Sequence, residues 1–152
     1  ANRGIASNYA RNLLLPKLSE HKITIFLSAK VGGISKKPAE LIKLTFFEQG
    51  LYNRIIAPLL PSPAERSSGF MTFEQISAIC QQPVTELNNI NNIEGLAMLD
   101  KAQPDLILSI RYGVILKNEA IRKARLGVLN LHSGLLQKYR GVMATFWAML
   151  NG

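Results

Sequence analysis

Apolar residues recur along the chain at steps of three and four in some stretches and in short continuous runs in others. The longest stepped pattern joins five residues: Leu41, Leu44, Phe47, Leu51 and Ile55. This spacing places apolar side chains on one face of an α-helix. It predicts a long amphipathic helix that begins at Pro38, a residue favoured at the first helical position, and that is stopped by Pro58 and by the prolines after it.

Shorter helices are predicted from their caps. Ser7 is placed to cap a first helix, which Pro16 should kink or divide. Thr72, with Gln75 three residues later, has the spacing of a capping box and predicts a helix over residues 73–81. The asparagine-rich run 88–92 is expected to end a strand and cap a further helix. The remaining predicted helices cover residues 94–101, 117–124 and 145–150.

Continuous apolar and β-branched runs predict strands between these helices. They cover residues 22–28, 83–88, 104–110 and 126–132, and glycine- or proline-rich loops are expected over 31–37 and 61–69. The run 104–110 is typical of a strand buried on both faces of a parallel sheet. Strands that alternate with helices predict an α/β fold with a parallel sheet.

Composition narrows the class of protein. The chain has 152 residues, which suits a single domain, and 47% of them are hydrophobic, which excludes a disordered chain. One cysteine excludes an internal disulfide and a paired-cysteine metal knuckle, so we expect no metal site and a reducing, cytoplasmic environment. The apolar runs are too short to cross a membrane.

The net charge of +8 is unevenly distributed. Residues 1–37 carry +6, residues 38–100 carry −4, and residues 101–152 carry +6. If the two basic ends meet, they form a positive face able to attract phosphate or carboxylate groups. Because the lysines and arginines are dispersed, we favour small anionic ligands or solubility over a polynucleotide as the reason for this charge.

Candidate chemistry lies at the end of the last predicted strand. Asn130 and His132 are separated by one residue, so both side chains point to the same side of an extended backbone. An asparagine amide can donate to an oxygen that gains negative charge, and a histidine can transfer a proton near neutral pH. The pair suits acyl or formyl transfer. A strand end whose polar groups are satisfied by loop amides is the alternative.

A longer motif surrounds this pair. Residues 130–141 read Asn-Leu-His-Ser-Gly-Leu-Leu-Gln-Lys-Tyr-Arg-Gly. They resemble the signature of the N-terminal catalytic domain of folate-dependent formyltransferases: Asn-x-His, two residues drawn from Pro, Ser and Gly, Leu-Leu-Pro, two variable positions and Arg-Gly. Gln137 stands where the family has the proline. Residues 104–116 and 147–152 are similar to the same family at matching distances from Asn130.

The resemblance implies a Rossmann-like domain over residues 1–152, with an open, mostly parallel sheet flanked by helices, that takes 10-formyltetrahydrofolate as formyl donor. It implies that Asn130 hydrogen-bonds the formyl oxygen and that His132 supports the same charge or moves the proton of the attacking amine. It also implies that the folate lies against one segment of the chain: Ile110, Arg111, Tyr112, Gly113, Val114, Ile115 and Leu116.

The start of the chain adds a hypothesis about the formyl acceptor. Residues 4–8, Gly-Ile-Ala-Ser-Asn, are similar to the turn of glycinamide ribonucleotide transformylases at which helix amides receive a substrate phosphate. The resemblance implies that Ser7 and Asn8 bind the acceptor, although ordinary helix capping explains them equally well. It favours a small, phosphorylated amine, with an aminoacyl-tRNA as the other acceptor.

Some family features fall outside the 152 residues. The family's third catalytic residue, an aspartate, follows the helix matched by residues 147–152, and most of its first strand precedes residue 4. We therefore expect the domain to extend at both ends. Two other functions stay open: hydrolysis of the formyl-folate, and a ligand-binding or assembly module of the same fold without turnover.

Overall fold

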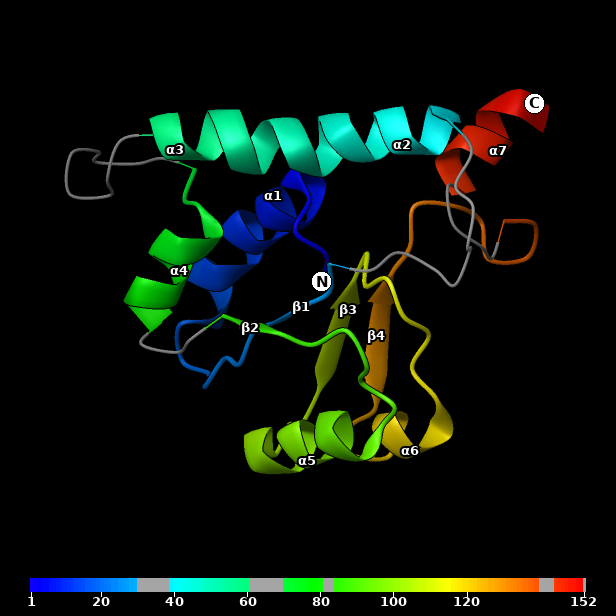
Figure 1. Ribbon diagram of the computed structural model, residues 1–152. Helices are drawn as coiled ribbons and strands as arrows, with labels where there is room; N and C mark the ends of the chain where they lie inside the picture. The colour runs from blue at the N-terminus through cyan, green and yellow to red at the C-terminus, as the bar shows by residue number, and fades with distance from the viewer. Residues whose placement is uncertain (30–38, 61–69, 81–83, 140–143, 152) are drawn as a thin grey trace.

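The computed structural model describes residues 1–29, 39–60, 70–80, 84–139 and 144–151. Helices and short strands alternate along the chain (Figure 1). The helices are α1 (Ile5–Leu14), η1 (Leu15–Leu18), α2 (Ala39–Thr45), η2 (Phe46–Ile56), α3 (Ala57–Leu59), α4 (Phe73–Cys80), α5 (Ile93–Ala102), α6 (Asn118–Ile121) and α7 (Ala144–Asn151). The strands are β1 (Phe26–Leu27), β2 (Thr85–Glu86), β3 (Ile107–Ile110) and β4 (Val128–Leu131).

All four strands run in parallel pairs. β1 pairs with β2, with Phe26 opposite Thr85. β3 pairs with β4 in a register that sets Ser109 opposite Asn130. Parallel strands connected through helices are the signature of an open α/β architecture, so the predicted Rossmann-like class is confirmed. The strands are shorter than the apolar runs that predicted them.

The two strand pairs are joined through a shared core. One buried cluster lies around β1, η2 and α4: Ile25, Leu27, Tyr52, Phe73 and Ile76. A second buried cluster lies around α5 and α6: Leu87, Ile90, Leu99 and Ala120. Phe26 of β1 and Ile107 of β3 both pack against this second cluster. A common apolar core therefore holds the β1–β2 pair to the β3–β4 pair.

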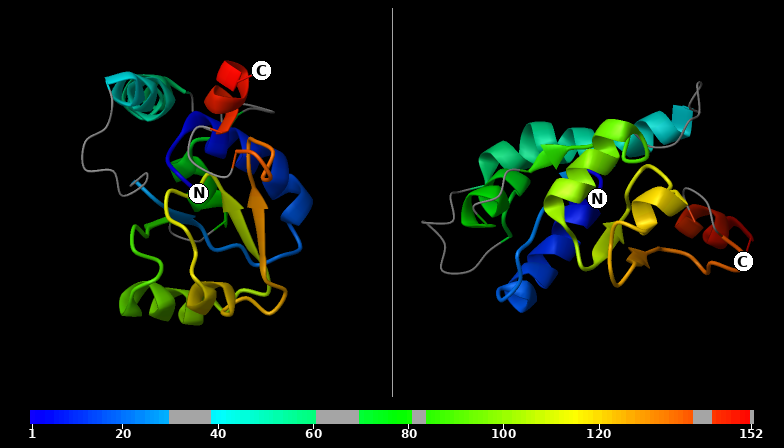
Figure 2. Two further views of the ribbon diagram at one scale, coloured as in Figure 1. Left: turned by 90° about the vertical axis from the view of Figure 1, so that its right-hand side faces the viewer. Right: turned by 90° about the horizontal axis from the view of Figure 1, so that it is seen from below.

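The ends of β3 and β4 are oriented by the helices that precede them. Figures 1 and 2 show α5 and α6 at one end of these strands, with both strand arrows pointing away from them and toward α7. The carboxyl ends of β3 and β4 therefore lie at the edge where ligands bind in open parallel sheets.

One face of the β3–β4 pair is exposed except at Ile110, which is 7% exposed, and this corrects the prediction that the strand over 104–110 is buried on both faces. Leu108 is 38% exposed, and Leu129 and Leu131 are 60% and 59% exposed. These residues alternate with Ile107 and Asn130, so they share the face opposite the α5–α6 core. An apolar strand is buried on both sides only when other elements cover both faces of the sheet. In the described part of the chain, no element covers the side chain of Leu129.

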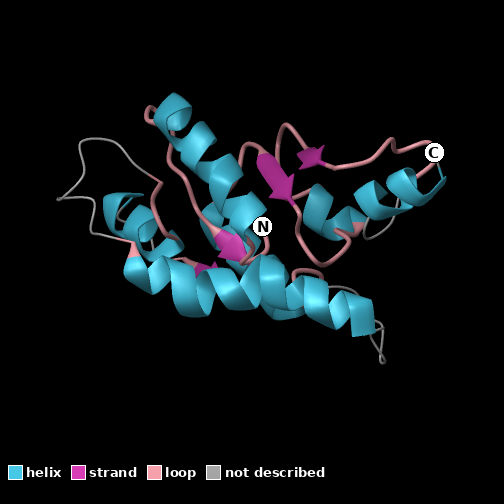
Figure 3. Cartoon of the chain, turned by 90° about the horizontal axis from the view of Figure 1, so that it is seen from above, coloured by secondary structure: helices cyan, strands magenta, loops and turns pink. Residues whose placement is uncertain are grey.

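The predicted long helix is present, and its packing differs from the prediction. Figure 3 shows α2, η2 and α3 as one continuous rod. Phe47 and Ile55 are 62% and 50% exposed, whereas Tyr52 is 1% exposed. η2 is a π-helix, whose wider i→i+5 bonding displaces side chains from the i+3 and i+4 face that the sequence spacing assumes.

The predicted stop of this helix near Pro58 is confirmed. Pro58 lies in the last turn, and the helix ends at Leu59, one residue beyond it. Other parts of the predictions lie outside the described residues: the loops over 31–37 and 61–69, Pro38 at the start of the long helix, residue 81 of the helix 73–81, residue 83 of the strand 83–88, and the Arg-Gly end of the motif at 140–141.

The predicted caps of α4 and α5 are confirmed. The Thr72 hydroxyl accepts from the Gln75 amide at 3.2 Å, and the Gln75 side chain accepts from the Thr72 amide at 2.9 Å. The Asn92 side chain accepts from the Gly95 amide at 2.8 Å. Such local bonds need two nearby residues and no tertiary context, which is why spacing alone found them.

The first helix differs from its prediction at one end. α1 begins at Ile5 with Gly4 in the capping position, so Ser7 lies inside the helix and does not cap it. Pro16 divides the helical stretch as predicted, because the α-helix ends at Leu14 and a 3-10 turn continues it. Among the described helices, none combines the length and the apolar character that a membrane crossing requires.

Candidate active site

Asn130 and His132 lie at the carboxyl end of β4 on the face that carries Ile107. The register sets Asn130 opposite Ser109, two residues beyond the Ile107–Val128 pair. Asn130 is exposed and His132 is half-buried. Because side chains alternate along an extended chain, this pair lies on the side of the sheet that carries Ile107 and Val128. The structure therefore brings the two predicted catalytic side chains to one face.

The His132 ring is oriented by a tight turn. Its Nε2 lies 2.7 Å from the Tyr139 carbonyl oxygen, and the amides of Lys138 and Tyr139 both donate to the Leu135 carbonyl, at 3.0 and 2.7 Å. A carbonyl oxygen can only accept, so in this contact Nε2 carries the proton. Nδ1 is then the ring nitrogen left to accept a proton.

Gly134 allows this turn to approach α7. A Cβ added at Gly134 would lie 2.5 Å from the Cβ of Ala144 and 3.2 Å from the Cβ of Tyr139. Ala144 is itself buried, at 2% exposure. A glycine at 134 is therefore required by close packing, and any side chain there would displace the turn that orients His132.

The segment predicted to hold the folate is divided between buried and exposed side chains. Ile110 is buried, and Val114 and Leu116 pack against the second core cluster. Arg111 and Ile115 are exposed, with Ile115 at 87%. Most of the segment is thus held at the core, and the two exposed side chains, Arg111 and Ile115, are what a flat ring could contact.

The backbone turns sharply at the start of this segment. Arg111 has a φ of 48°, a left-handed conformation that is uncommon for a residue with a Cβ. Gly113 follows and is half-buried. Non-glycine residues in this region cost free energy and concentrate at functional sites. The turn redirects the chain away from β3 immediately after the carboxyl end of the strand.

The Tyr112 hydroxyl also holds this segment in place through a hydrogen bond. It donates to the Leu87 carbonyl oxygen at the end of the β2 stretch. Burial raises the pKa of Tyr112 from its ordinary value of 10.0 to about 12. The folded protein therefore keeps this phenol protonated in a range where the unfolded chain would ionise it.

This pKa predicts a specific loss of stability in alkali. Between about pH 10 and 12 the folded state binds a proton that the unfolded state releases, so the free energy of unfolding falls as pH rises. Spectrophotometric titration should show Tyr112 ionising near pH 12, and Tyr112→Phe should remove that phase. Burial also raises the pKa of Tyr52, so Tyr52→Phe is the comparison that must leave the Tyr112 phase in place.

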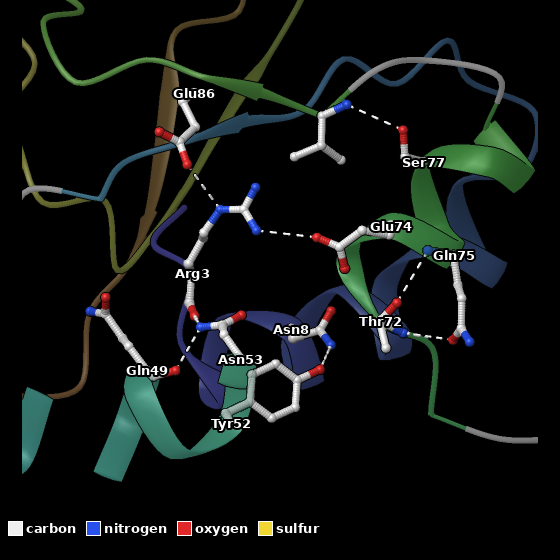
Figure 4. Close-up of polar contacts among 11 residues, drawn as sticks. Arg3, Asn8, Gln49, Tyr52, Asn53, Thr72, Glu74, Gln75, Ser77 and Glu86 are labelled. Carbon is white, nitrogen blue, oxygen red and sulfur yellow. Dashed lines mark hydrogen bonds and ion pairs between the residues drawn. The ribbon is translucent and has the colours of Figure 1, made fainter. Parts of the chain in front are cut away.

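Ser7 and Asn8, the predicted acceptor-binding residues, are fully buried (Figure 4 shows Asn8). The Ser7 hydroxyl donates to Asn2 Oδ1. The Asn8 amide donates to the Tyr52 hydroxyl and, at 2.9 Å, to the Met71 carbonyl. Both side chains are therefore engaged inside the protein, and the first-turn amides of α1 are what this segment offers to a ligand.

Two of the basic residues at this end of the chain are engaged in the packing of the fold. Arg3 lies 3.1 Å from a Glu86 oxygen and 3.2 Å from a Glu74 oxygen (Figure 4). The Arg11 guanidinium is buried and lies 4.5 Å above the centre of the Phe73 ring. These two arginines therefore stabilise the packing of α1 and add less to a positive face than the count of charges suggests.

In the described part of the chain, a metal site would need several side chains that could bind the ion together. Within those residues, no group of three or more His, Cys, Asp or Glu side chains is close enough to hold a metal ion.

Comparison with known proteins decides the family. The sequence model described as formyl transferase matches residues 23–152, which is most of the chain. The chain belongs to the formyl transferase family. Its match includes β3, the 110–116 segment, β4 and the Asn130–His132 pair, so the elements that form the candidate site are those shared with the family.

Two kinds of protein are found among the relatives. The bifunctional polymyxin resistance protein ArnA of Wigglesworthia glossinidia brevipalpis is 32% identical over 131 residues, 86% of this chain and 19% of that protein. The methionyl-tRNA formyltransferase of Clostridium tetani is 42% identical over 59 residues, 39% of this chain and 19% of that protein. The enzyme of the same name from Rhodopirellula baltica is 43% identical over 70 residues, 46% of this chain and 21% of that protein. The chain thus spans about a fifth of the length of these relatives.

Asn91 is a residue of this region that sequence reasoning missed. Its Nδ2 donates to the Ile115 carbonyl and its Oδ1 accepts from the Lys117 amide, both at 2.8 Å. The run 88–92 carried the signal, since asparagines in loops commonly bond backbone groups. The predicted strand end and cap account for only part of this run, because its members have separate partners: Asn88, for example, accepts from the Ala29 amide at 2.8 Å.

Proposed function

We propose that this chain forms the catalytic domain of an enzyme that transfers a formyl group from 10-formyltetrahydrofolate to a primary amine. The observation that carries the proposal is the placement of Asn130 and His132 at the carboxyl end of β4, beside the carboxyl end of β3 from which the 110–116 segment continues. Membership of the formyl transferase family supports the reaction class.

Asn130 is suited to stabilise charge on the formyl oxygen. Its side chain is exposed near the carboxyl end of β4 and carries an N–H donor. When an amine adds to a formyl carbon, the carbonyl oxygen becomes an oxyanion, and an N–H placed to meet it lowers the barrier by stabilising the charge that develops. The strand backbone fixes the Cα of this donor, so little reorganisation is needed.

His132 is suited to remove the proton that the amine loses. The attacking nitrogen becomes positively charged as its bond to carbon forms, and a base must take its proton before the old C–N bond breaks. The contact between Nε2 and the Tyr139 carbonyl leaves Nδ1 as the accepting atom and holds the ring plane. The same proton can then pass to the leaving nitrogen, which closes the proton balance.

The 110–116 segment fits a flat heterocycle in its chemistry. Ile115 presents an exposed apolar side chain, while the residues on either side of it pack against the core and keep the backbone in place. When bound, the folate supplies an activated formyl carbon. The chain supplies the apolar surface, the oxyanion donor and the base.

For the acceptor we favour a small amine. The two methionyl-tRNA formyltransferases described above match less than half of this chain. Two basic residues also pair with acidic residues at the surface: Lys123 with Asp100 at 2.6 Å and Arg125 with Asp105 at 2.9 Å. A polynucleotide would instead use exposed, unpaired cations.

The test is a formyl-transfer assay with the full-length protein and 10-formyltetrahydrofolate. Amino sugars linked to nucleotides, glycinamide ribonucleotide and methionyl-tRNA are offered in parallel, and both the formylated product and tetrahydrofolate are measured. Formylation of a small amine is the expected result. Formylation of methionyl-tRNA with steep salt dependence would replace the acceptor. Release of formate without a formylated product would indicate a hydrolase, and no consumption of the donor would contradict the enzyme assignment.

A further inference from the structure

We propose that Asn91 is a positioning residue for the folate-binding segment, which its side-chain amide clamps at the carboxyl end. This inference rests on the proposed function, because it gives a role in folate binding to a residue outside the segment. Asn91 Nδ2 donates to the Ile115 carbonyl, and Asn91 Oδ1 accepts from the Lys117 amide, both at 2.8 Å. One side chain therefore binds the backbone on both sides of Leu116.

A second hydrogen bond holds the other end of the segment. The Tyr112 hydroxyl donates to the Leu87 carbonyl, so residues 112 and 115–117 are both tied to the stretch 87–91. That stretch is rigid in its own right, since Leu87 and Ile90 are buried and the Asn92 amide donates to the Asn89 carbonyl at 3.2 Å. The buried stretch 87–91 thus holds the segment 110–116, in which Arg111 has a left-handed backbone.

The clamp determines what the segment shows to solvent. The backbone of Ile115 is held by Asn91, while the Ile115 side chain is 87% exposed. An exposed isoleucine on a fixed backbone is a preorganised apolar contact, which binds a rigid ring without first losing loop entropy. Asn91 and Lys117 also line a surface cleft with Asn118 and Glu119, so the clamp lies at the edge of an open concavity.

The chemistry of the clamp requires an asparagine. It needs a donor for a carbonyl and an acceptor for an amide within one short side chain, and the asparagine amide offers both. An aspartate would keep the acceptor for Lys117 and turn a second acceptor toward the Ile115 carbonyl. An alanine would offer neither group. Asn91→Ala and Asn91→Asp should therefore both loosen the segment.

Asn92 provides a matched control. It is the neighbouring asparagine, and its side chain also bonds a backbone amide. That amide belongs to Gly95 in α5, which lies outside the folate segment. Asn92→Ala removes a helix cap and should lower stability. A purely structural role for Asn91 would make the two alanine variants alike, whereas a positioning role separates them in folate binding.

The experiment measures binding of 5-formyltetrahydrofolate, a non-transferring analogue, by titration calorimetry with the full-length protein and the three variants. We expect Asn91→Ala and Asn91→Asp to weaken binding by about three- to tenfold, the size of one or two lost hydrogen bonds in a partly exposed site. Asn92→Ala should bind as the wild type does. In the transfer assay the Asn91 variants should raise KM for the donor with kcat within about twofold.

A second measurement is independent of folate. In native-state hydrogen exchange, the Lys117 amide should lose protection in Asn91→Ala, and the Gly95 amide should lose it in Asn92→Ala. Unchanged protection of Lys117 in Asn91→Ala would overturn the clamp itself.

The failures of the two proposals are distinguishable. If the wild type binds the analogue and Asn91→Ala binds it with the same Kd, the positioning role is wrong and the proposed function stands. If the wild type binds no reduced folate and transfers no formyl group, the proposed function is wrong. The folate role of Asn91 then falls with it, whatever the exchange of Lys117 shows.

Discussion

Replacing His132 by alanine is expected to lower kcat for formyl transfer by about 10²–10⁴-fold, the usual contribution of a positioned acid–base group. The expected reason is loss of the Nδ1 acceptor that the contact between Nε2 and the Tyr139 carbonyl leaves available. KM for the donor should change little, because the apolar segment is untouched. The measurement is steady-state kinetics of tetrahydrofolate release with saturating amine.

The chain supplies a matched control for this variant, since it has two histidines. His21 is exposed and follows the 3-10 turn η1, so His21→Ala should leave kcat unchanged. A His132→Ala protein with wild-type kcat would contradict the assigned base. Asn130→Asp keeps the size of the side chain and removes its donor, and we expect it to lower kcat by about 10²–10³-fold.

Replacing Gly95 by alanine is expected to give a large loss of stability. A Cβ at this position would lie 2.3 Å from the Asn89 carbonyl oxygen and 2.7 Å from the Ile90 Cα. Both are backbone atoms of the buried loop that precedes α5, so neither moves without the loop. Overpacking of this kind costs about 1–3 kcal/mol, and a shift of about 5–10 °C in Tm is expected at the upper end.

The sign of this effect is diagnostic, because Gly95 lies inside a helix. Alanine has the higher helix propensity by about 1 kcal/mol, so propensity alone would make Gly95→Ala stabilising. Gly127→Ala is the contrasting control. In the described structure nothing lies within 4 Å of a Cβ at Gly127, and its φ of 85° makes the cost one of backbone conformation alone. Thermal unfolding of the two variants measures the cost of the close approach at Gly95 and the cost of the backbone conformation at Gly127. A Gly95→Ala protein with a raised Tm would contradict the close approach.

The structure follows the sequence wherever a feature depends on near neighbours. Thr72 and Gln75 are three residues apart and form their box, and Asn92 caps α5 as the asparagine run predicts. Pro16 ends α1 because a proline ring and a missing N–H act within one turn. The alternation of strands and helices has the same local origin, and it is why the α/β class could be predicted.

Predictions that assumed a regular helix or a complete set of layers are those that the structure corrects. Spacing at three and four residues assigned Phe47 and Ile55 to a buried face, but the π-helical hydrogen bonding of η2 rotates them into solvent and buries Tyr52. Ser7 has the chemistry of a cap, yet the helix begins at Ile5 and Ser7 donates to the buried Asn2. Neither outcome is encoded in a short window of sequence.

The candidate site divides in the same way. The sequence alone determined that Asn130 and His132 share a side of a strand, because that follows from the two-residue period of an extended chain. Tertiary structure decided which nitrogen of His132 carries its proton, through the Tyr139 carbonyl seven residues away. It also decided that Asn91 holds the backbone of Ile115 and Lys117, more than twenty residues distant. Side-chain period and caps are properties of neighbours, whereas these contacts exist only once the chain has packed distant loops against one core.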